Sequence, residues 1–452
     1  MSVREHKLKV GVSGVRGVVG EFLTPALTTA LSQAFGTYVG RGRVIVGRDT
    51  RPSGEMILHA VRCGLLAAGC EVVDVGILPT PTIQVYVAAT KAQGGIAITA
   101  SHNPPEYNAL KFFNAQGLFC NTYERGELID LWHQSSFHHA QNAEMRGVTT
   151  ELVAPKKLHF ERVLSHVDVE RIRRRRFRVG LDAVNGAGSL PSVEFLTEYL
   201  NCELHAIAVD PAKPFPRVAE PRPDTLGDLS KLVRETGCDI GFAQDPDGDR
   251  LAVADETGRV LDNDDVLALA VDACLARLPG DVVVNLTTSS VIDDIAARHN
   301  RRVFRTPVGE ANVVERMQRA KAVIGGEGSN GGIIFPAVQY CRDSYNGMAF
   351  LLDLMAASGE PVTKLAGRLP QYTRMAGSVA YQHGRLAALM QAVEDAFIAP
   401  HVDRSDGLKL IWPGHWIHVR SSNTEPILRF AVESTSEAEA RALFERVKEF
   451  AA

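Results

Sequence analysis

The sequence has 452 residues, of which 45% are hydrophobic and 23% are charged, and its formal net charge is −4. This composition is ordinary for a globular protein, and the small net charge gives no bulk attraction to nucleic acid or to an anionic membrane. The first ten residues are charged and lack the apolar stretch of a secretory signal. No apolar run reaches the ~20 residues of a membrane span. We therefore expect a cytoplasmic protein that binds neither nucleic acid nor membrane.

The cysteine pattern and the chain length bound the architecture further. Seven cysteines are scattered without a CxxC pair, which indicates reduced thiols and not a disulfide framework or a zinc site. At roughly 100–150 residues per domain, the length predicts three or four domains.

One unit of strand, loop, helix and strand recurs three times along the chain. Its first strands are predicted at residues 43–47, 178–182 and 282–285. Strands that alternate with helices indicate α/β folding with largely parallel sheets, and three similar copies indicate three related α/β domains.

The C-terminal part breaks this pattern. Strands are predicted at 408–412, 416–420 and 427–433, followed by a helix over 435–450. Consecutive strands covered by a helix are typical of an α+β domain with an antiparallel sheet. The expected domains are 1–151, 152–254, 255–369 and 370–452.

A basic run at residues 171–178 suggests nucleic-acid binding at first sight. Because the whole chain is acidic and the run has no interleaved aromatic residues, we interpret it as a linker or the end of a helix.

The first stretch that carries chemistry surrounds Ser101. A buried strand is predicted at 96–99, and Ser101 lies just beyond its C-terminal end, where ligand sites of open α/β sheets occur. The serine could be a nucleophile or phosphoryl carrier, or only a capping residue in a tight turn. His102 is its neighbour, and Lys111 could supply positive charge. A Ser/His/Asp hydrolase is disfavoured because the GxSxG motif is missing.

The second stretch contains Asp245, Asp247 and Asp249 in a turn between two apolar strands. Three carboxylates so close together repel one another unless a counter-ion is present. Oxygen ligands favour a hard divalent cation, magnesium or calcium. An EF-hand is excluded because Arg250 occupies the position where that loop needs glycine, and because strands flank the turn.

The third stretch, residues 324–335, has five glycines around Glu327, Ser329 and Asn330. Glycines let a backbone approach a ligand closely, and the polar side chains suit sugar hydroxyls. A flexible turn is the alternative interpretation.

The fourth stretch, residues 419–429, gathers donors in a turn between strands. Arginines, hydroxyls and free backbone N–H groups are typical of a phosphate cradle, and an ordinary hairpin turn is the alternative. The residues expected to bind phosphate are Arg420, Ser422, Asn423, Thr424 and Arg429.

Near the N-terminus, the glycine-rich residues 11–20 place Arg16 in what we expect to be a flexible loop, from which it could reach a phosphate. The spacing does not fit a dinucleotide-binding fingerprint.

Together these stretches indicate phosphoryl transfer. Metal and arginines would stabilise the charge on the moving group. A separate cradle means that the substrate carries a second, non-reacting phosphate, as an intramolecular phosphate shift requires.

The ordered motifs SGVRG, TASHNP, DPDGDR, GGEGSNGG and RSSNTEP resemble the α-D-phosphohexomutase family over nearly the whole chain. The resemblance implies four domains around a central cleft, a phosphorylated Ser101, and Mg²⁺ bound by Ser101 together with Asp245, Asp247 and Asp249. It also implies a sugar bisphosphate as intermediate and activator.

The same resemblance assigns roles to other residues. Arg16, Lys111 and His102 become candidates for acid/base or charge-stabilising roles. The residues implied to bind substrate are Arg250, Thr306, Gly309, Glu327, Ser329 and Asn330.

The resemblance implies that the substrate is a phosphosugar, and we expect a monomer or homodimer. The loop GEGSNGG lacks the histidine of the GEMSGH type found in many members, which leaves the acid/base residue open. Its context looks more like the phosphoglucosamine mutase branch, with the phosphoglucomutase/phosphomannomutase branch as the alternative. A metal-dependent sugar phosphatase and a non-catalytic sugar-phosphate sensor are weaker alternatives.

Overall fold

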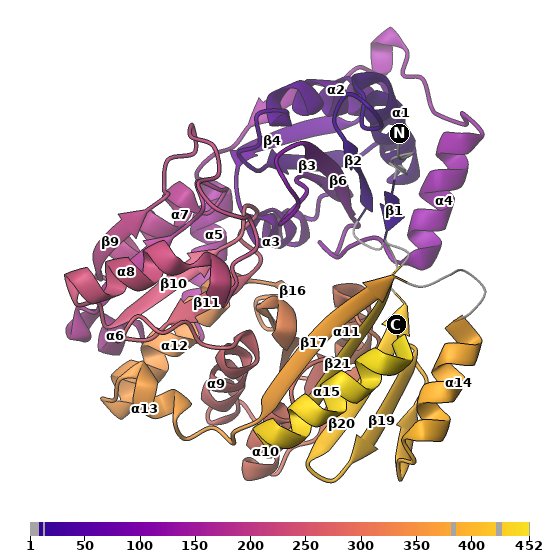
Figure 1. Ribbon diagram of the computed structural model, residues 1–452. Helices are drawn as coiled ribbons and strands as arrows, with labels where there is room; N and C mark the ends of the chain where they lie inside the picture. The colour runs from indigo at the N-terminus through magenta and orange to yellow at the C-terminus, as the bar shows by residue number, and fades with distance from the viewer. Residues whose placement is uncertain (1–8, 12–13, 381–385, 422–426, 452) are drawn as a thin grey trace. The chain divides into compact units, whose positions relative to one another are not determined.

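The computed structural model describes residues 9–11, 14–380, 386–421 and 427–451 (Figure 1). The chain forms two compact units. One unit holds Met1–Asp262 with Gly332–Leu365, and the other holds Asn263–Gly331 with Ala366–Ala452. Within the described ranges, every helix is too short or too polar to span a bilayer.

The N-terminal sheet has seven strands in the order β1-β2-β6-β5-β3-β4-β7. Strand β3 pairs in parallel with both β4 and β5, whereas β6 runs antiparallel to β5. The strands are β1 (Lys9–Gly11), β2 (Gly14–Val18), β3 (Arg43–Arg48), β4 (Glu71–Ile77), β5 (Gly94–Ile98), β6 (Tyr107–Phe113) and β7 (Val148–Thr150).

Helices cover both faces of this sheet because the buried side chains of its central strands alternate. Val44 and Val46 pack in the core formed with α1 (Pro25–Tyr38), α2 (Gly54–Ala67) and α4 (Thr122–His133). Ile45, between them, packs on the other side with α3 (Thr80–Thr90). Successive side chains of a strand point to opposite faces, which explains the division. The predicted strand–helix–strand unit beginning at residue 43 is confirmed.

The expectation of a flexible loop around Arg16 is wrong. Arg16 lies on β2, which pairs antiparallel with β1 and with β6. Gly14 serves close packing here: its φ is +118°, and a Cβ at this position would lie 2.0 Å from the carbonyl oxygen of Leu110. A glycine can adopt this conformation, so the strand approaches β6 without a clash.

The second sheet has the order β11-β10-β8-β9. Strand β10 pairs in parallel with β8 and antiparallel with β11, so a tight turn at residues 245–250 joins two buried strands. The basic run ends α6 (Val169–Arg175), as one of the two interpretations predicted. The remaining elements are α5 (Ala154–Leu164), β8 (Arg178–Asp182), α7 (Ser189–Glu194), a π-helical turn (Phe195–Tyr199), β9 (Glu203–Ile207), α8 (Gly227–Thr236), β10 (Ile240–Gln244) and β11 (Leu251–Ala254).

In the third domain's sheet, β12 is parallel to both β13 and β14, and β15 is antiparallel to β16. The third predicted repeat is therefore confirmed. Its elements are α9 (Asn263–Leu275), β12 (Val282–Asn285), α10 (Val291–Arg298), β13 (Val303–Thr306), α11 (Glu310–Ala320), β14 (Ile324–Glu327), β15 (Gly332–Phe335), β16 (Gln339–Arg342), α12 (Ser344–Ser358) and α13 (Val362–Ala366).

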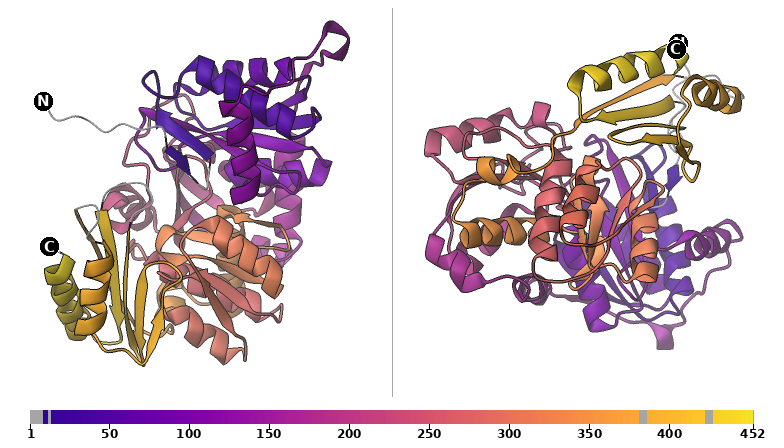
Figure 2. Two further views of the ribbon diagram at one scale, coloured as in Figure 1. Left: turned by 90° about the vertical axis from the view of Figure 1, so that its right-hand side faces the viewer. Right: turned by 90° about the horizontal axis from the view of Figure 1, so that it is seen from below.

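The C-terminal sheet is antiparallel, in the order β17-β21-β20-β19-β18, which confirms an α+β domain. Figure 2 shows α14 and α15 on the same face of this sheet, and residues of both helices share its core. The sequence prediction omitted β17, β18 and α14. The elements are β17 (Thr373–Ala380), α14 (Leu386–Ala396), β18 (His401–Asp403), β19 (Leu408–Trp412), β20 (His415–Ser421), β21 (Ile427–Ser434) and α15 (Glu437–Ala451).

Two buried charged side chains of this C-terminal sheet bind the loop that follows β12 in the same unit. Lys409 donates from Nζ to the carbonyl oxygen of Leu286 at 2.6 Å. Glu433 accepts the backbone N–H of Ser290 at 2.8 Å through Oε1. Trp416 donates to the same Glu433 oxygen at 2.7 Å, so buried polar groups join the two domains of this unit.

Candidate active site

Ser101 lies in the turn that follows β5, and its side chain points into a buried polar cluster. Its hydroxyl donates to Asp245 Oδ2 at 2.8 Å, and its backbone N–H donates to Thr99 Oγ1 at 2.9 Å. Only 3% of the residue is exposed. Its φ of +50° places it in the left-handed region, which a non-glycine residue rarely adopts. The turn therefore holds the serine in a defined, strained orientation.

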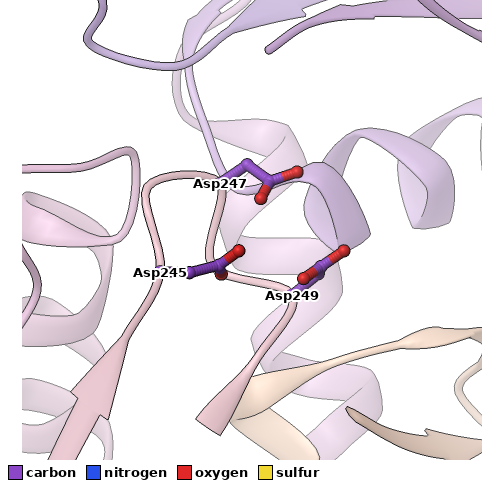
Figure 3. Close-up of side chains that lie close together, drawn as sticks. All are labelled: Asp245, Asp247 and Asp249. Carbon is purple, nitrogen blue, oxygen red and sulfur yellow. The ribbon is translucent and has the colours of Figure 1, made fainter. Parts of the chain in front are cut away.

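The turn between β10 and β11 carries three carboxylates that lie close together (Figure 3). We call these residues, Asp245, Asp247 and Asp249, the aspartate cluster. One carboxylate oxygen from each lies within 4.8 Å of the others, and all three residues are buried. Asp247 Oδ1 and Asp249 Oδ1 are buried and accept no hydrogen bond from the described residues. Because an unpaired buried carboxylate oxygen is costly and all the donors are oxygens, the cluster fits a hard divalent cation.

Three cations surround the aspartate cluster. Lys111 Nζ lies 2.5 Å from Asp247 Oδ2 and 3.9 Å from Asp249 Oδ2. Arg342 Nη2 lies 2.7 Å from Asp249 Oδ2, and Arg250 Nε lies 3.9 Å from Asp249 Oδ1. These cations partly compensate the clustered negative charge, and they lie where they could also bind a phosphate group on Ser101.

The environment drives two of the carboxyl pKa values apart. Burial, followed by the charges of Asp247 and Asp249, raises the pKa of Asp245 well above its usual range. Burial also acts to raise the pKa of Asp247, but the Lys111 ammonium and hydrogen bonds from neighbouring side chains outweigh it and hold that pKa far below its usual range. Like charges that share a site commonly separate in this way.

His102 is held as a neutral hydrogen-bond acceptor. Its Nδ1 accepts from Arg250 Nη2 at 2.9 Å and lies 3.5 Å from the Ser101 hydroxyl oxygen. Burial, with Arg250 and Arg16 adding repulsion, lowers the pKa of His102 to about 2. Arg250 is held in turn by Glu220 Oε1 at 2.6 Å.

Arg16 reaches the same turn from β2, where its guanidinium donates to Asn103 Oδ1. Burial lowers the pKa of Arg16, although Asp247 opposes that shift. The structure thus brings Arg16, Lys111, His102, Arg250, Ser101 and the aspartate cluster together within one unit.

Sequence reasoning missed Arg342 and Glu220. Neither belongs to a recognisable motif, and Arg342 follows Asp249 by 93 positions. Only the tertiary fold brings them to the cluster, so no local pattern could have found them.

Of the six residues predicted to bind substrate, Arg250 lies at the aspartate cluster and the other five lie in the other unit. Glu327, at the end of β14, accepts from Asn285 Nδ2 at 2.9 Å and from the Gly309 backbone N–H at 2.8 Å, both through Oε1. Ser329 Oγ lies 3.4 Å from Thr287 Oγ1. Three strand ends therefore meet at Glu327, as the carboxyl ends of parallel strands do. Thr306 ends β13, and Asn330 lies in the 3₁₀ turn Gly328–Asn330.

Two arginines of the predicted phosphate cradle lie directly opposite each other. Arg420 on β20 and Arg429 on β21 are cross-strand partners. Burial, opposed by Asp406 and supported by Arg429, lowers the pKa of Arg420. Like charges directly opposite each other on a sheet are destabilising, and an anion would relieve the repulsion. Ser422, Asn423 and Thr424 lie outside the described residues.

Models of four successive domains of one protein family match the chain. All four carry the description phosphoglucomutase/phosphomannomutase: alpha/beta/alpha domain I at residues 7–138, domain II at 157–258, domain III at 262–372 and the C-terminal domain at 385–450.

Individual relatives match over almost their whole lengths. A phosphoglucomutase/phosphomannomutase of Thermococcus kodakarensis is 38% identical over 443 residues, which cover 96% of each chain. A probable phosphoglucosamine mutase of Methanopyrus kandleri is 36% identical and covers 96% of this chain and 95% of its own. The crystal structure of a phosphoglucomutase/phosphomannomutase family protein from Burkholderia thailandensis matches with a TM-score of 0.84, 25% identity and 98% coverage of both chains.

The fold and these matches define the class as phosphohexomutase, an isomerase that moves phosphate between two positions of a hexose. The chain belongs to the phosphoglucomutase/phosphomannomutase family.

Proposed function

We propose that this phosphohexomutase interconverts glucosamine 6-phosphate and glucosamine 1-phosphate through phospho-Ser101. The observation that carries the mechanism is the buried hydrogen bond from the Ser101 hydroxyl to Asp245, beside two carboxylate oxygens that lack a partner among the described residues. Such a site suits a serine that carries a phosphate and needs compensating positive charge.

The reaction takes place in two half-reactions. The bond between phosphorus and Ser101 Oγ breaks while a bond forms from phosphorus to the free hydroxyl oxygen of the sugar monophosphate. That hydroxyl gives up its proton and Ser101 Oγ takes one up, so the serine is released as a neutral hydroxyl. The sugar bisphosphate then reorients, and its other phosphoryl group is transferred to Ser101 Oγ. Phosphoryl transfer of this kind depends on positioning and charge stabilisation more than on covalent participation by the protein.

The residues around Ser101 supply that stabilisation. Mg²⁺ held by the aspartate cluster and a phosphoserine oxygen would neutralise charge on the transferring group. Lys111, Arg16 and Arg342 are proposed to stabilise the same charge. Their cationic groups lie at the aspartate cluster or at residues 99–106, the turn between β5 and β6 that we call the serine turn. We assign His102 the role of orienting Arg250, because its Nδ1 is already an acceptor and burial lowers its pKa to about 2.

The remaining predicted residues are proposed to recognise the sugar phosphate. Glu327, fixed by two donors to Oε1, would bind a hydroxyl or amino group of the sugar together with Ser329 and Asn330. Arg420 and Arg429 would bind the non-reacting phosphate with Ser422, Asn423 and Thr424. Thr306 and Gly309 would position the loop after β13.

Two sugar specificities have support. Glucosamine phosphate is favoured by the NGG sequence of the sugar loop and by the Methanopyrus kandleri relative, named probable phosphoglucosamine mutase. Glucose and mannose phosphates are the second candidates, because the Thermococcus kodakarensis relative is named phosphoglucomutase/phosphomannomutase.

A comparison of kcat/KM for glucosamine, glucose and mannose 6-phosphates, with the matching sugar bisphosphates present, separates these candidates. We expect the highest value for glucosamine 6-phosphate. Equal values for all three would refute this preference. Release of inorganic phosphate as fast as isomerisation would instead indicate a phosphatase, and binding without turnover would indicate a sensor.

We propose a cytoplasmic enzyme that acts as a monomer or homodimer, with domain boundaries near residues 151, 254 and 369. Size-exclusion chromatography with light scattering would measure the oligomeric state.

A further inference from the structure

Arg51, which no motif singled out, donates to three backbone carbonyls of the serine turn and to the carbonyl of Tyr107, the first residue of β6. Its Nη2 reaches the carbonyl oxygens of Ser101 at 2.6 Å and Asn103 at 2.7 Å. Its Nη1 reaches those of Pro104 at 2.7 Å and Tyr107 at 3.1 Å. Only 1% of Arg51 is exposed, so these bonds are shielded from water.

The fifth donor of the same guanidinium is also used. Arg51 Nε donates to Asp49 Oδ2 at 3.0 Å, and the Arg51 backbone N–H donates to Asp49 Oδ1 at 3.0 Å. A guanidinium has five N–H donors in a fixed planar arrangement, and here each one has an acceptor. A lysine offers three donors at a single nitrogen and could not reproduce this set.

Asp49 extends the network to the other side of Ser101. Thr99 Oγ1 donates to Asp49 Oδ2 at 2.7 Å and accepts the Ser101 backbone N–H at 2.9 Å. Both backbone polar groups of Ser101 are therefore connected to the buried ion pair of Arg51 and Asp49. The N–H is linked to Asp49 through the Thr99 hydroxyl, and the carbonyl accepts directly from Arg51.

The conformation of Ser101 explains why so many bonds are needed. Its φ of +50° is strained for a non-glycine residue, and such strain persists only where the surroundings over-determine it. The same conformation sets the direction of the Cβ–Oγ bond, which ends 2.8 Å from Asp245 Oδ2.

We propose that Arg51 is a positioning residue for phosphoryl transfer: it fixes the strained turn so that the Ser101 oxygen stays aimed at the aspartate cluster. This inference rests on the proposed role of Ser101 as phosphoryl carrier. The Arg51 guanidinium donates its hydrogen bonds to backbone oxygens of residues 101–107 and to the Asp49 carboxylate, and its Cζ lies 5.3 Å from the centroid of the Phe215 ring. Among the described residues these contacts hold the turn, so Arg51 acts through Ser101 and not on the substrate.

The test compares Arg51→Lys with wild type and with Arg171→Lys. Arg171 forms a 2.6 Å ion pair with Asp353 away from the serine turn, so its variant controls for loss of a half-buried guanidinium. A misplacement of about 1 Å can cost about 100-fold in rate. We expect kcat of Arg51→Lys to fall by about 10- to 100-fold, while KM for the sugar phosphate stays within about threefold.

A second readout separates positioning from general destabilisation. Transfer of phosphate from a sugar bisphosphate onto dephosphorylated Ser101, followed by intact-protein mass spectrometry, should slow by the same factor in Arg51→Lys as kcat does. In Arg51→Ala, low millimolar guanidinium should restore part of the rate, whereas equal sodium chloride should not.

Thr99→Val provides the same test if the arginine variants fail to fold. It removes the link from Asp49 to the Ser101 N–H and keeps the side-chain size, and we expect a kcat loss of about 3- to 30-fold with unchanged KM.

Wild-type rates of Ser101 phosphorylation in these variants would overturn the positioning role, and so would a raised KM with normal kcat. A wild-type protein that isomerises sugar phosphates without ever phosphorylating Ser101 would instead refute the proposed function on which this inference rests.

Discussion

Replacing Lys111 by methionine removes a cation from the aspartate cluster and keeps a side chain of similar length. The lysine Nζ lies 2.5 Å from Asp247 Oδ2 and 3.9 Å from Asp249 Oδ2, and all three side chains are at most 2% exposed. The variant therefore leaves a buried carboxylate without its main partner.

The expected cost follows from that burial. Breaking a buried ion pair by removing one partner costs about 3–5 kcal/mol, since the remaining charge stays desolvated. A cation that binds only the folded state stabilises it by about 2.7 kcal/mol when its concentration is 100 times its dissociation constant. Because the ammonium no longer competes for Asp247, we expect Mg²⁺ to stabilise Lys111→Met more than wild type.

Thermal unfolding followed by circular dichroism, with EDTA or with excess Mg²⁺, measures both effects. At about 2–4 °C per kcal/mol for a domain of 150–250 residues, Lys111→Met should unfold about 6–20 °C below wild type in EDTA. Lys156→Met is the control, because Lys156 pairs with Glu194 at a partly exposed site and should cost no more than about 1 kcal/mol. A loss below 1 kcal/mol in Lys111→Met, or an equal Mg²⁺ effect in both variants, would refute the reasoning.

Three further predictions concern separate parts of the chain. Burial lowers the pKa of His418 from its ordinary value of about 6.5 to about 4. The unfolded state then binds more protons between these pH values, and stability falls by about 3 kcal/mol as pH drops through this window. Denaturant titrations should show this loss in wild type and in the exposed control His401→Gln, but a smaller loss in His418→Gln; equal losses in all three proteins would contradict it. Arg342→Met removes a cation from the aspartate cluster and should lower kcat by about 10- to 100-fold in steady-state assays, and an unchanged kcat would exclude a role in charge stabilisation. Gly14→Ala places a Cβ 2.0 Å from the Leu110 carbonyl oxygen and should cost more than about 1 kcal/mol in urea unfolding, whereas a neutral effect would mean that β2 can move away from β6.

The sequence predicted those features that depend on local pattern. Runs of β-branched residues such as 44–46 and 282–284 identify buried parallel strands, and both lie in strands of the structure. The acidic turn from Asp245 to Asp249 combines turn residues with carboxylates, so its position between two strands could also be predicted.

The features that escaped prediction depend on long-range contacts or on unusual backbone geometry. Arg51 meets the serine turn about 50 positions later in the chain, and Arg342 meets Asp249 across 93 positions. Glycine usually indicates a turn, so the glycine-rich segment around Arg16 predicts a loop. Here Gly14 instead permits close approach to β6, which only the paired strand reveals.

Intact-protein mass spectrometry of wild type and Ser101→Ala, combined with mutase assays on the same preparations, tests the central claim most directly. After incubation with sugar bisphosphate, wild type should gain one phosphoryl group that peptide mapping places on Ser101. Ser101→Ala should gain none and should lose mutase turnover. A Ser101→Ala protein that retains full mutase activity would contradict the account.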